Sequence, residues 1–190
     1  MNLRLRHLLV LSVLLALAAF PALAATDDET IKVFKDAGES GKFFDKCYGY
    51  AVFPNVGKGG IGVGAAHGTG RVYVQGKVIG DTTMNQVSIG AQLGGQSYSE
   101  IIFFEDKRAL DEFTSGNFEF GAQASAVAIT AGASAKAGSG GSSAGASGGK
   151  HDASTAGGYH KGMAVFTVAK GGLMYEASIG GQKFKYTPKK

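Results

Sequence analysis

Residues 48–74 constrain the fold more than any other part of the chain. They read YGYAVFPNVGKGGIGVGAAHGTGRVYV, with β-forming apolar residues interrupted by glycines at positions 57, 59, 60, 62 and 64. Glycine inside a strand marks a bulge, a tight bend or the close approach of another backbone. Gly60, Gly62 and Gly64 are spaced two residues apart, which places them on one face of a strand. The stretch therefore predicts closely packed, curved strands rather than a flexible chain.

The rest of the chain alternates between strand patterns, glycine turns and a few helices. Helices are predicted at residues 26–38, 40–48 and 106–115. Thr26 or Asp27 can cap the first, Asp106 can cap the third, and Gly116 can form the turn that ends it. Residues 131–157 are mostly Gly, Ala and Ser and are predicted to form a flexible loop within one domain. Strands are predicted at 50–54 (ended by Pro54), 60–66, 71–75, 87–93, 98–104, 118–130, 163–169, 173–179 and 183–187. Turns are predicted at 67–70, 75–77, 94–95, 171–172 and 180–181. The last three strands are expected to form a meander.

These elements together predict the fold class. Eight or nine strands joined mainly by glycine turns favour an α+β domain built on a strongly curved antiparallel sheet, or a barrel-like β core. The helices are expected at the N-terminus and once in the middle of the chain.

The first 24 residues have the pattern of a secretory signal peptide. Arg4 and Arg6 precede an apolar run at residues 8–20, and Ala22 and Ala24 supply the small residues before a cleavage site. The alternative is a retained anchor, but a membrane-spanning helix needs about 20 apolar residues. The sequence therefore predicts cleavage after Ala24, a single domain at residues 25–190, and a periplasmic or secreted location.

The net charge does not favour a nucleic-acid partner, and the cysteine content excludes an intramolecular disulfide. The formal net charge of +4 falls to +2 when residues 1–24 are removed, because they contain two arginines and no acid. Such a weak charge does not predict a nucleic-acid partner. Cys47 is the only cysteine, so no intramolecular disulfide can form, and its apolar neighbours predict a small buried residue rather than a reactive thiol.

No recognised catalytic, nucleotide-binding or metal-binding pattern is present. In a P-loop, lysine is followed by Ser or Thr, whereas Lys58 is followed by glycine. A dinucleotide fingerprint opens a helix, whereas a strand pattern continues after Gly64. His67, His151 and His160 are scattered, which does not favour a metal site. We therefore expect a protein that is not an enzyme and has no cofactor, with an unrecognised hydrolase as the enzymatic alternative.

The remaining candidate is a lipid-binding surface on the glycine-rich strands. Glycine positions allow an acyl chain to approach closely, and cations near the turns can contact phosphate head groups. The lysines of the two N-terminal helices could add an amphipathic face, or they could form a solvated face, since acids alternate with them. The candidate lipid-binding residues are Lys58, Gly59, Gly60, Gly62, Gly64, Arg71, Lys77, Lys42 and Lys46.

Several motifs occur in an order that identifies a family. AVFPNV at residues 51–56 is followed by KGG and GVG, at 58–60 and 62–64. The later motifs are GAQLGGQ at 90–96, ALDEF at 109–113, GNFEFGA at 116–122, KGGL at 170–173 and EASIGG at 176–181. From about residue 34 onward the chain resembles the SYLF domain. It departs from the family at Gln123, where aspartate is common, and at Ala131-Gly132, where many members have Gly-Pro.

The resemblance implies a non-enzymatic lipid-binding module. In eukaryotic members it implies phosphoinositide binding, membrane remodelling and, in some, contact with actin. Because a periplasmic location offers neither ligand, we expect only a general binding of membrane lipids, with anionic phospholipid favoured and peripheral membrane association. The alternative is a structural or protein-interaction module of the periplasm, with an unknown protein partner.

Overall fold

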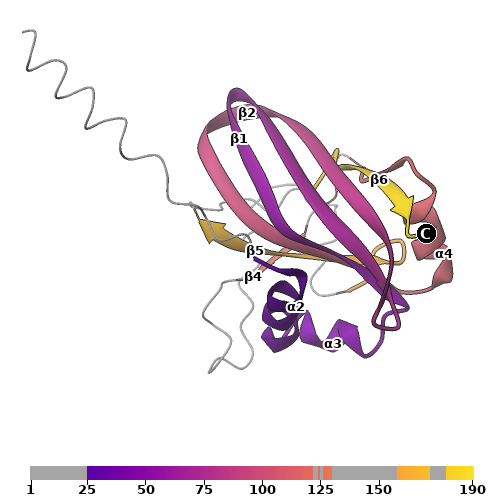
Figure 1. Cartoon of the computed structure of the whole chain (residues 1–190). Coiled ribbons are helices and arrows are strands. Elements are labelled where there is room, and N and C mark those ends of the chain that lie inside the picture. Colours follow the sequence, from indigo (N-terminus) through magenta and orange to yellow (C-terminus); the bar gives the residue numbers. More distant parts are fainter. Residues whose placement is uncertain (1–24, 122–123, 125, 130–157, 172–178) are drawn as a thin grey trace, which may run out of the picture.

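The structure is a computed structural model that describes residues 25–121, 124, 126–129, 158–171 and 179–190 (Figure 1). The predicted signal peptide and the predicted loop at 131–157 lie outside the described residues. Within them, all the strands belong to one sheet. In chain order the elements are α2 (Asp27–Asp36), α3 (Gly41–Phe44), β1 (Gly49–Val74), β2 (Lys77–Phe104), α4 (Lys107–Thr114), β3 (Phe118–Glu119), β4 (Val127–Ile129), β5 (Met163–Gly171) and β6 (Lys183–Pro188).

Strands β1 and β2 form one long antiparallel ribbon that is bent back on itself (Figure 1). They are joined by a tight turn at Gln75 and Gly76, whose φ angles of 49° and 75° match the turn type that suits a twisted hairpin. At the bend the pairing passes from Ile61↔Leu93 to Val63↔Ile89, so one residue of β1 lies opposite three of β2. Strand β2 therefore takes the longer, outer path around the bend.

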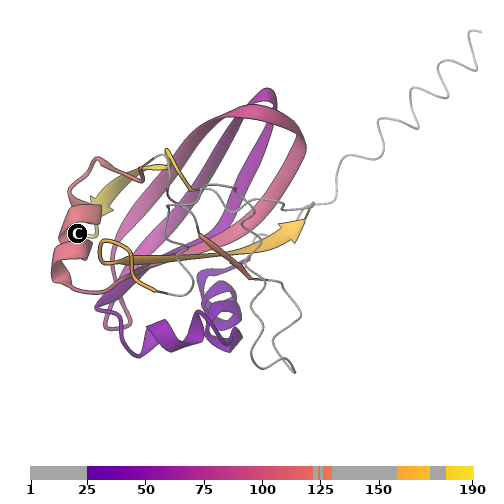
Figure 2. The ribbon, with the colours of Figure 1, turned by 180° about the vertical axis from the view of Figure 1, so that it is seen from behind.

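Strand β2 is the centre of the sheet. On the edge that does not pair with β1, residues 80–85 of β2 pair with β6 and residues 97–104 of β2 pair with β5. Strand β3 pairs antiparallel with β6, and β4 pairs in parallel with β5. The strongly curled, mostly antiparallel sheet confirms the predicted core (Figure 2). The parallel β4 is a departure from the predicted antiparallel sheet. Strands β5 and β6 each pair with a different part of β2, and most of the middle strand of the predicted meander lies outside the described residues.

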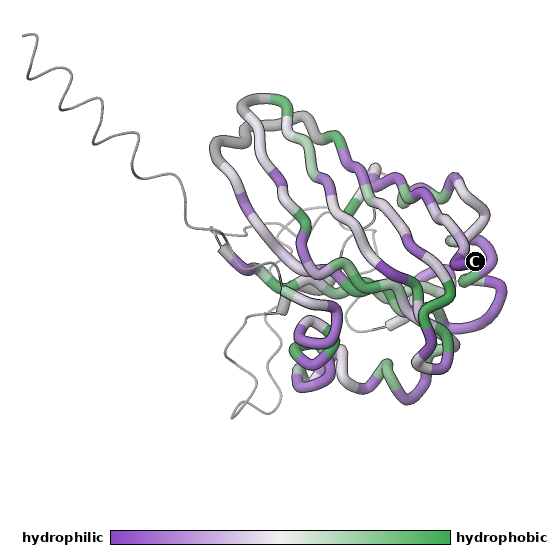
Figure 3. Tube along the Cα trace, in the orientation of Figure 1, coloured by the Kyte–Doolittle hydropathy of each residue, from purple (hydrophilic) through white to green (hydrophobic). Residues whose placement is uncertain are grey.

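The second half of β2 is buried on both faces, as its apolar sequence predicted. Ile102 points into the main core together with Phe113 of α4. Phe103 points the other way, toward α2 and α3, and its ring lies 5.4 Å from that of Phe43 and near the fully buried Phe34. Figure 3 shows the hydrophobic segments gathered at this base of the ribbon, next to the helices. The base therefore anchors the bent ribbon.

Both longer helices were predicted from their caps. Thr26 and Glu29 form a capping box at α2, in which the Thr26 Oγ1 accepts from the Glu29 amide at 3.3 Å and the Glu29 carboxylate accepts from the Thr26 amide at 2.9 Å. At α4 the Asp106 carboxylate accepts from the Ala109 amide at 2.9 Å. Gly116, with a φ of 104°, follows the end of that helix as predicted.

Other predicted boundaries were wrong because local turn signals lie inside long strands. Pro54 does not end a strand: it occupies a bulge between the pairs Phe53↔Glu100 and Val56↔Tyr98, where the ladder does not need its missing N–H. Residues 67–70 and 94–95 continue β1 and β2 without turning. The second helix has four residues rather than the predicted nine, and 118–130 contains the two short strands β3 and β4. Most of the predicted strand at 173–179 lies outside the described residues.

Candidate functional site

The structure separates the nine candidate residues into groups. Because a strand advances about 3.3 Å per residue, the path along the ribbon from Gly64 to Lys77 is about 40 Å. Lys42 lies in α3 and Lys46 directly after it, both exposed at the base. The sequence placed Arg71 beside a turn at 67–70, and that placement is wrong. The group at the bend comprises Lys58, Gly59, Gly60, Gly62 and Gly64, whereas Arg71 and Lys77 lie toward the Gln75-Gly76 turn.

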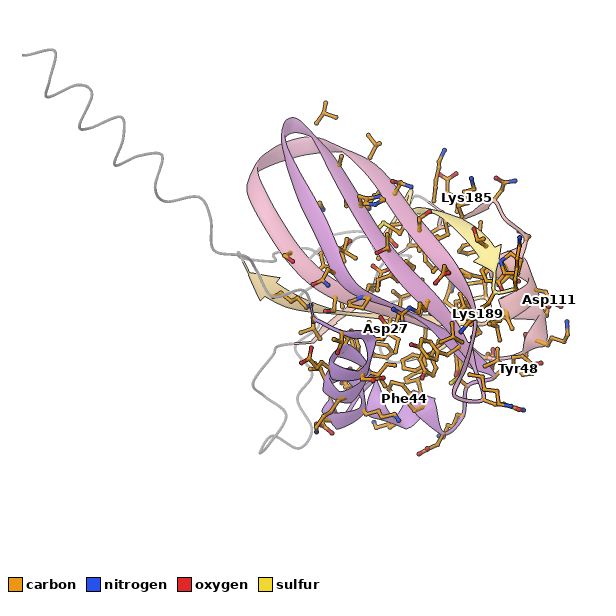
Figure 4. The ribbon with its side chains drawn as sticks, in the orientation of Figure 1. Asp27, Phe44, Tyr48, Asp111, Lys185 and Lys189 are labelled. Carbon is orange, nitrogen blue, oxygen red and sulfur yellow. The ribbon has the colours of Figure 1, made fainter. Side chains whose placement is uncertain are left out.

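Arg71 holds α2 against the sheet. Its guanidinium lies 3.2 Å from the Asp27 carboxylate, which also accepts a hydrogen bond of 2.6 Å from the Tyr73 hydroxyl. Figure 4 shows Asp27 at the start of α2, against the ribbon. Burial, together with the bond to Asp27, raises the pKa of Tyr73 and keeps its phenol protonated. Arg71 therefore has a structural partner, and its contact with lipid stays a prediction.

Gly60 has a structural reason to be glycine. A Cβ at this position would meet the Val63 carbonyl oxygen and would lie 2.5 Å from the Gly64 Cα, across the inside of the bend. Any side chain would force the two halves of β1 apart at this point. Glycine at position 60 therefore allows the bend itself, whether or not it also contacts a ligand.

We define the bend arm as residues 57–66 of β1 and 86–97 of β2, which pair with each other. It projects from the end of the molecule away from the helices (Figure 1). Its only charged residue is Lys58, which is half-buried. Among the arm's side chains that the structure describes, the large apolar ones that are exposed are Val63 at 59% and Val87 at 70%. They are diagonal neighbours, because Ala65 pairs with Val87 and Val63 with Ile89.

Val87 was not among the candidate residues predicted from the sequence. The alternation of apolar and polar residues at 87–93 predicted a half-buried strand, and the apolar face of such a strand is ordinarily the buried one. The useful signal was instead a charge pattern, because no Asp, Glu, Lys or Arg occurs between residues 82 and 99. An exposed apolar side chain within an uncharged, projecting segment makes that segment a candidate contact surface.

The sequence analysis also missed a buried acid. Glu100 lies in the apolar second half of β2 and is 0% exposed. Its carboxylate accepts a 3.0 Å hydrogen bond from the Gln182 side chain. Burial raises the pKa of Glu100 to about 7, although the bond from Gln182 opposes the rise. In the sequence, Glu100 could have been noticed as a single acid between the uncharged residues 82–99 and the apolar residues 101–104.

Two further searches cover only the described ranges. No helix there is long and apolar enough to cross a membrane. No group of three or more His, Cys, Asp or Glu side chains there is arranged to hold a metal ion.

Comparison with known proteins identifies the family. Residues 85–188 match the family model described as "Ysc84: Las17-binding protein actin regulator", a region that begins inside β2 and ends with β6. The chain is also 34% identical over 104 residues to Beta cell expansion factor A of Aeromonas veronii, a match that covers 54% of this chain and 39% of that protein. It therefore spans about two fifths of this relative's length. Because the family model matches more than half of the chain, the protein belongs to the Ysc84 (SYLF) family, as its motifs predicted.

Proposed function

We propose that the protein is a non-enzymatic, peripheral membrane-binding protein of the cell envelope, and that the bend arm makes the lipid contact. The observation that carries this proposal is the projecting arm, which exposes Val63 and Val87 and has Lys58 as its only charged residue. The signal-peptide pattern supports a periplasmic or secreted location. Membership of the family agrees with a binding role rather than a catalytic one.

The expected contact is shallow and mainly apolar. Moving Val63 and Val87 from water into the acyl boundary contributes on the order of 1 kcal/mol each, because both are already partly covered. A lysine near an anionic surface adds about 1 kcal/mol. The total supports weak, reversible binding with a modest preference for anionic phospholipid. We do not expect Lys77 to meet the same surface, because it lies about 40 Å from Gly64 along the ribbon. The same holds for Lys42 and Lys46, which lie beside the helices at the end of the molecule opposite the bend.

Replacing Val87 with aspartate is expected to reduce vesicle binding at least tenfold, because a carboxylate must lose its hydration to enter the lipid boundary. The measurement is flotation of the purified protein with phosphatidylglycerol-containing and phosphatidylcholine vesicles. Val33→Asp is the matched control, since Val33 is an exposed valine on α2, at 44%. Equal binding by both variants, with unchanged thermal melting, would contradict a contact through the arm.

Replacing Lys58 with glutamate is expected to weaken binding to phosphatidylglycerol vesicles about fivefold or more and to leave binding to neutral vesicles nearly unchanged. The reason is the loss of one attraction and the gain of one repulsion at the anionic surface. The same reversal at Lys77, at the far end of β1 and β2, should have little effect. Flotation in low and high salt checks this, because an electrostatic difference must shrink as salt is added. If Lys77→Glu weakened binding more than Lys58→Glu, the lipid contact would lie at the base of the ribbon rather than at the bend.

A second candidate is a protein-interaction module of the periplasm. The description of the matching family names a protein-binding role, and this observation favours the second candidate. Chemical cross-linking that recovers a stoichiometric protein partner, combined with negative flotation, would support this candidate over membrane binding.

A further inference from the structure

Glu100 is the only buried carboxyl or amine in the described part of the chain. It lies on the inner face of the sheet, in the half of β2 that pairs with both β1 and β5. The residues directly opposite it are Phe53 in β1 and Thr167 in β5, and neither carries charge. Burying an ionised acid without a charged partner costs free energy. The hydrogen-bond contacts of Glu100 therefore indicate its role.

The contacts of Glu100 lead to residues 179–182, which we call the strap. Gln182 is fully buried, and its amide nitrogen donates to the Glu100 carboxylate at 3.0 Å and lies 3.5 Å from the Tyr98 hydroxyl. Gln86, from the first half of β2, donates to the Gly180 carbonyl oxygen at 3.0 Å. The strap is therefore tied to both halves of the bent strand, beside residues 86–96, for which the described structure shows no strand partner except β1.

The strap in turn positions the chain that follows α4. The Phe120 amide donates to the Gln182 carbonyl oxygen and the Gly181 amide to the Phe120 carbonyl oxygen, both at 3.0 Å. The Ile179 amide donates to the Ala124 carbonyl oxygen at 3.2 Å. Strand β6 begins directly after the strap, at Lys183. Loosening of the strap would therefore free several backbone contacts together.

The protonation state of Glu100 decides how well this cluster is satisfied. At Glu100 and the two polar residues that face it, one buried oxygen each has no hydrogen-bond partner among the described residues: Glu100 Oε1, Gln182 Oε1 and Thr167 Oγ1. A protonated Glu100 carries a donor that can serve a neighbouring acceptor. An ionised Glu100 carries only acceptors and loses its hydration, so burial disfavours it.

We propose that Glu100 is a proton-dependent latch, which holds the strap across both halves of β2 when protonated and releases it when ionised. The pKa of about 7 places the change near neutral pH. Tyr98 is the only other titratable group among the side chains described beside Glu100, and burial raises its pKa so that it stays neutral. The groups facing Glu100 from β1, β5 and the strap are Phe53, Thr167 and Gln182, which do not titrate.

The direction of the effect follows from the raised pKa. The carboxyl has an ordinary pKa of 4.5 when water reaches it and about 7 when the latch is closed. The closed state therefore binds the proton more tightly, and its advantage falls as the pH rises from about 4.5 to about 7. Between about pH 5.5 and about pH 8.5 the opening constant of the strap should rise about thirtyfold.

Hydrogen exchange of the purified protein without lipid tests the latch independently of the proposed membrane contact. The readout is the protection factor of the Phe120, Gly181 and Gln182 amides, which corrects for the intrinsic pH dependence of exchange. Protection of these amides should fall about thirtyfold over that pH range in the wild type and stay constant in Glu100→Gln. Glu105→Gln, which removes an exposed acid just beyond β2, should behave as the wild type.

A second variant keeps the test decisive if Glu100→Gln folds poorly. Gln182→Met removes the donor that lowers the pKa of Glu100, so the midpoint of the protection change should move to higher pH. A midpoint that does not rise would overturn the latch. The latch would also be overturned if Glu100→Gln lost as much protection with rising pH as the wild type. An equal loss of protection at the Thr30 amide of α2 would overturn it too, because the opening would then not be local to the strap.

Discussion

Replacing Gly70 with alanine is expected to lower the free energy of unfolding by about 2 to 3 kcal/mol. An added Cβ would meet the Val52 carbonyl oxygen and would lie 2.7 Å from a ring carbon of Phe53. Both residues are fully buried and are paired with β2, so they cannot move aside without disturbing the ladder. The cost therefore arises from overpacking between the two halves of β1.

The control for Gly70→Ala is the same substitution earlier in the same strand. Gly57 is exposed, and a Cβ there would meet nothing within 4 Å. Gly57→Ala should leave the free energy of unfolding within about 0.5 kcal/mol of the wild type, or raise it slightly by restricting the unfolded chain. Urea denaturation followed by circular dichroism measures both variants. Equal stabilities would mean that the halves of β1 do not approach each other as closely as described.

Gly70 also illustrates what the sequence could not reveal about the fold. Glycine at 68 and 70 reads locally as a turn, and a turn was predicted there. Its actual role is close approach to a partner nearly twenty residues earlier, a contact between distant residues that no local pattern encodes. The Gln75-Gly76 turn was predicted because a tight turn depends on its own residues. The caps of α2 and α4 were predicted for the same reason.

The candidate site shows the same division. The glycines and Lys58 were correctly grouped, because they are neighbours in the chain and share the bend. Arg71 was added to the group through a predicted turn at 67–70 that does not exist. Lys77 was added through the turn at 75–77, which exists but lies at the other end of the ribbon from the bend. Val87 was missed because its exposure depends on how the ribbon projects from the core, and alternation alone cannot say which face meets solvent.

Replacing Glu100 with glutamine is expected to make the protein more stable than the wild type by about 3 kcal/mol at about pH 8, and to change stability little at about pH 4. Glutamine has nearly the shape of a protonated carboxyl and can still accept the hydrogen bond from Gln182. The difference arises because the folded wild type holds a proton with a pKa of about 7, whereas the unfolded chain releases it at about 4.5. Because the pKa of Glu100 is raised in the fold, its protonated carboxyl stabilises the fold fully below about pH 4.5, and this stabilisation is lost as the pH rises to about 7.

Urea denaturation of both proteins across this pH range measures the difference directly, and subtraction cancels the titration of groups they share. Glu105→Gln should follow the wild type, because Glu105 is exposed and its ionisation costs little in the fold. A constant difference between Glu100→Gln and wild type would mean that the interior of the sheet solvates the carboxylate. Stability that instead rises with pH relative to Glu100→Gln would require a cation beside Glu100, and none of the described residues around it supplies one.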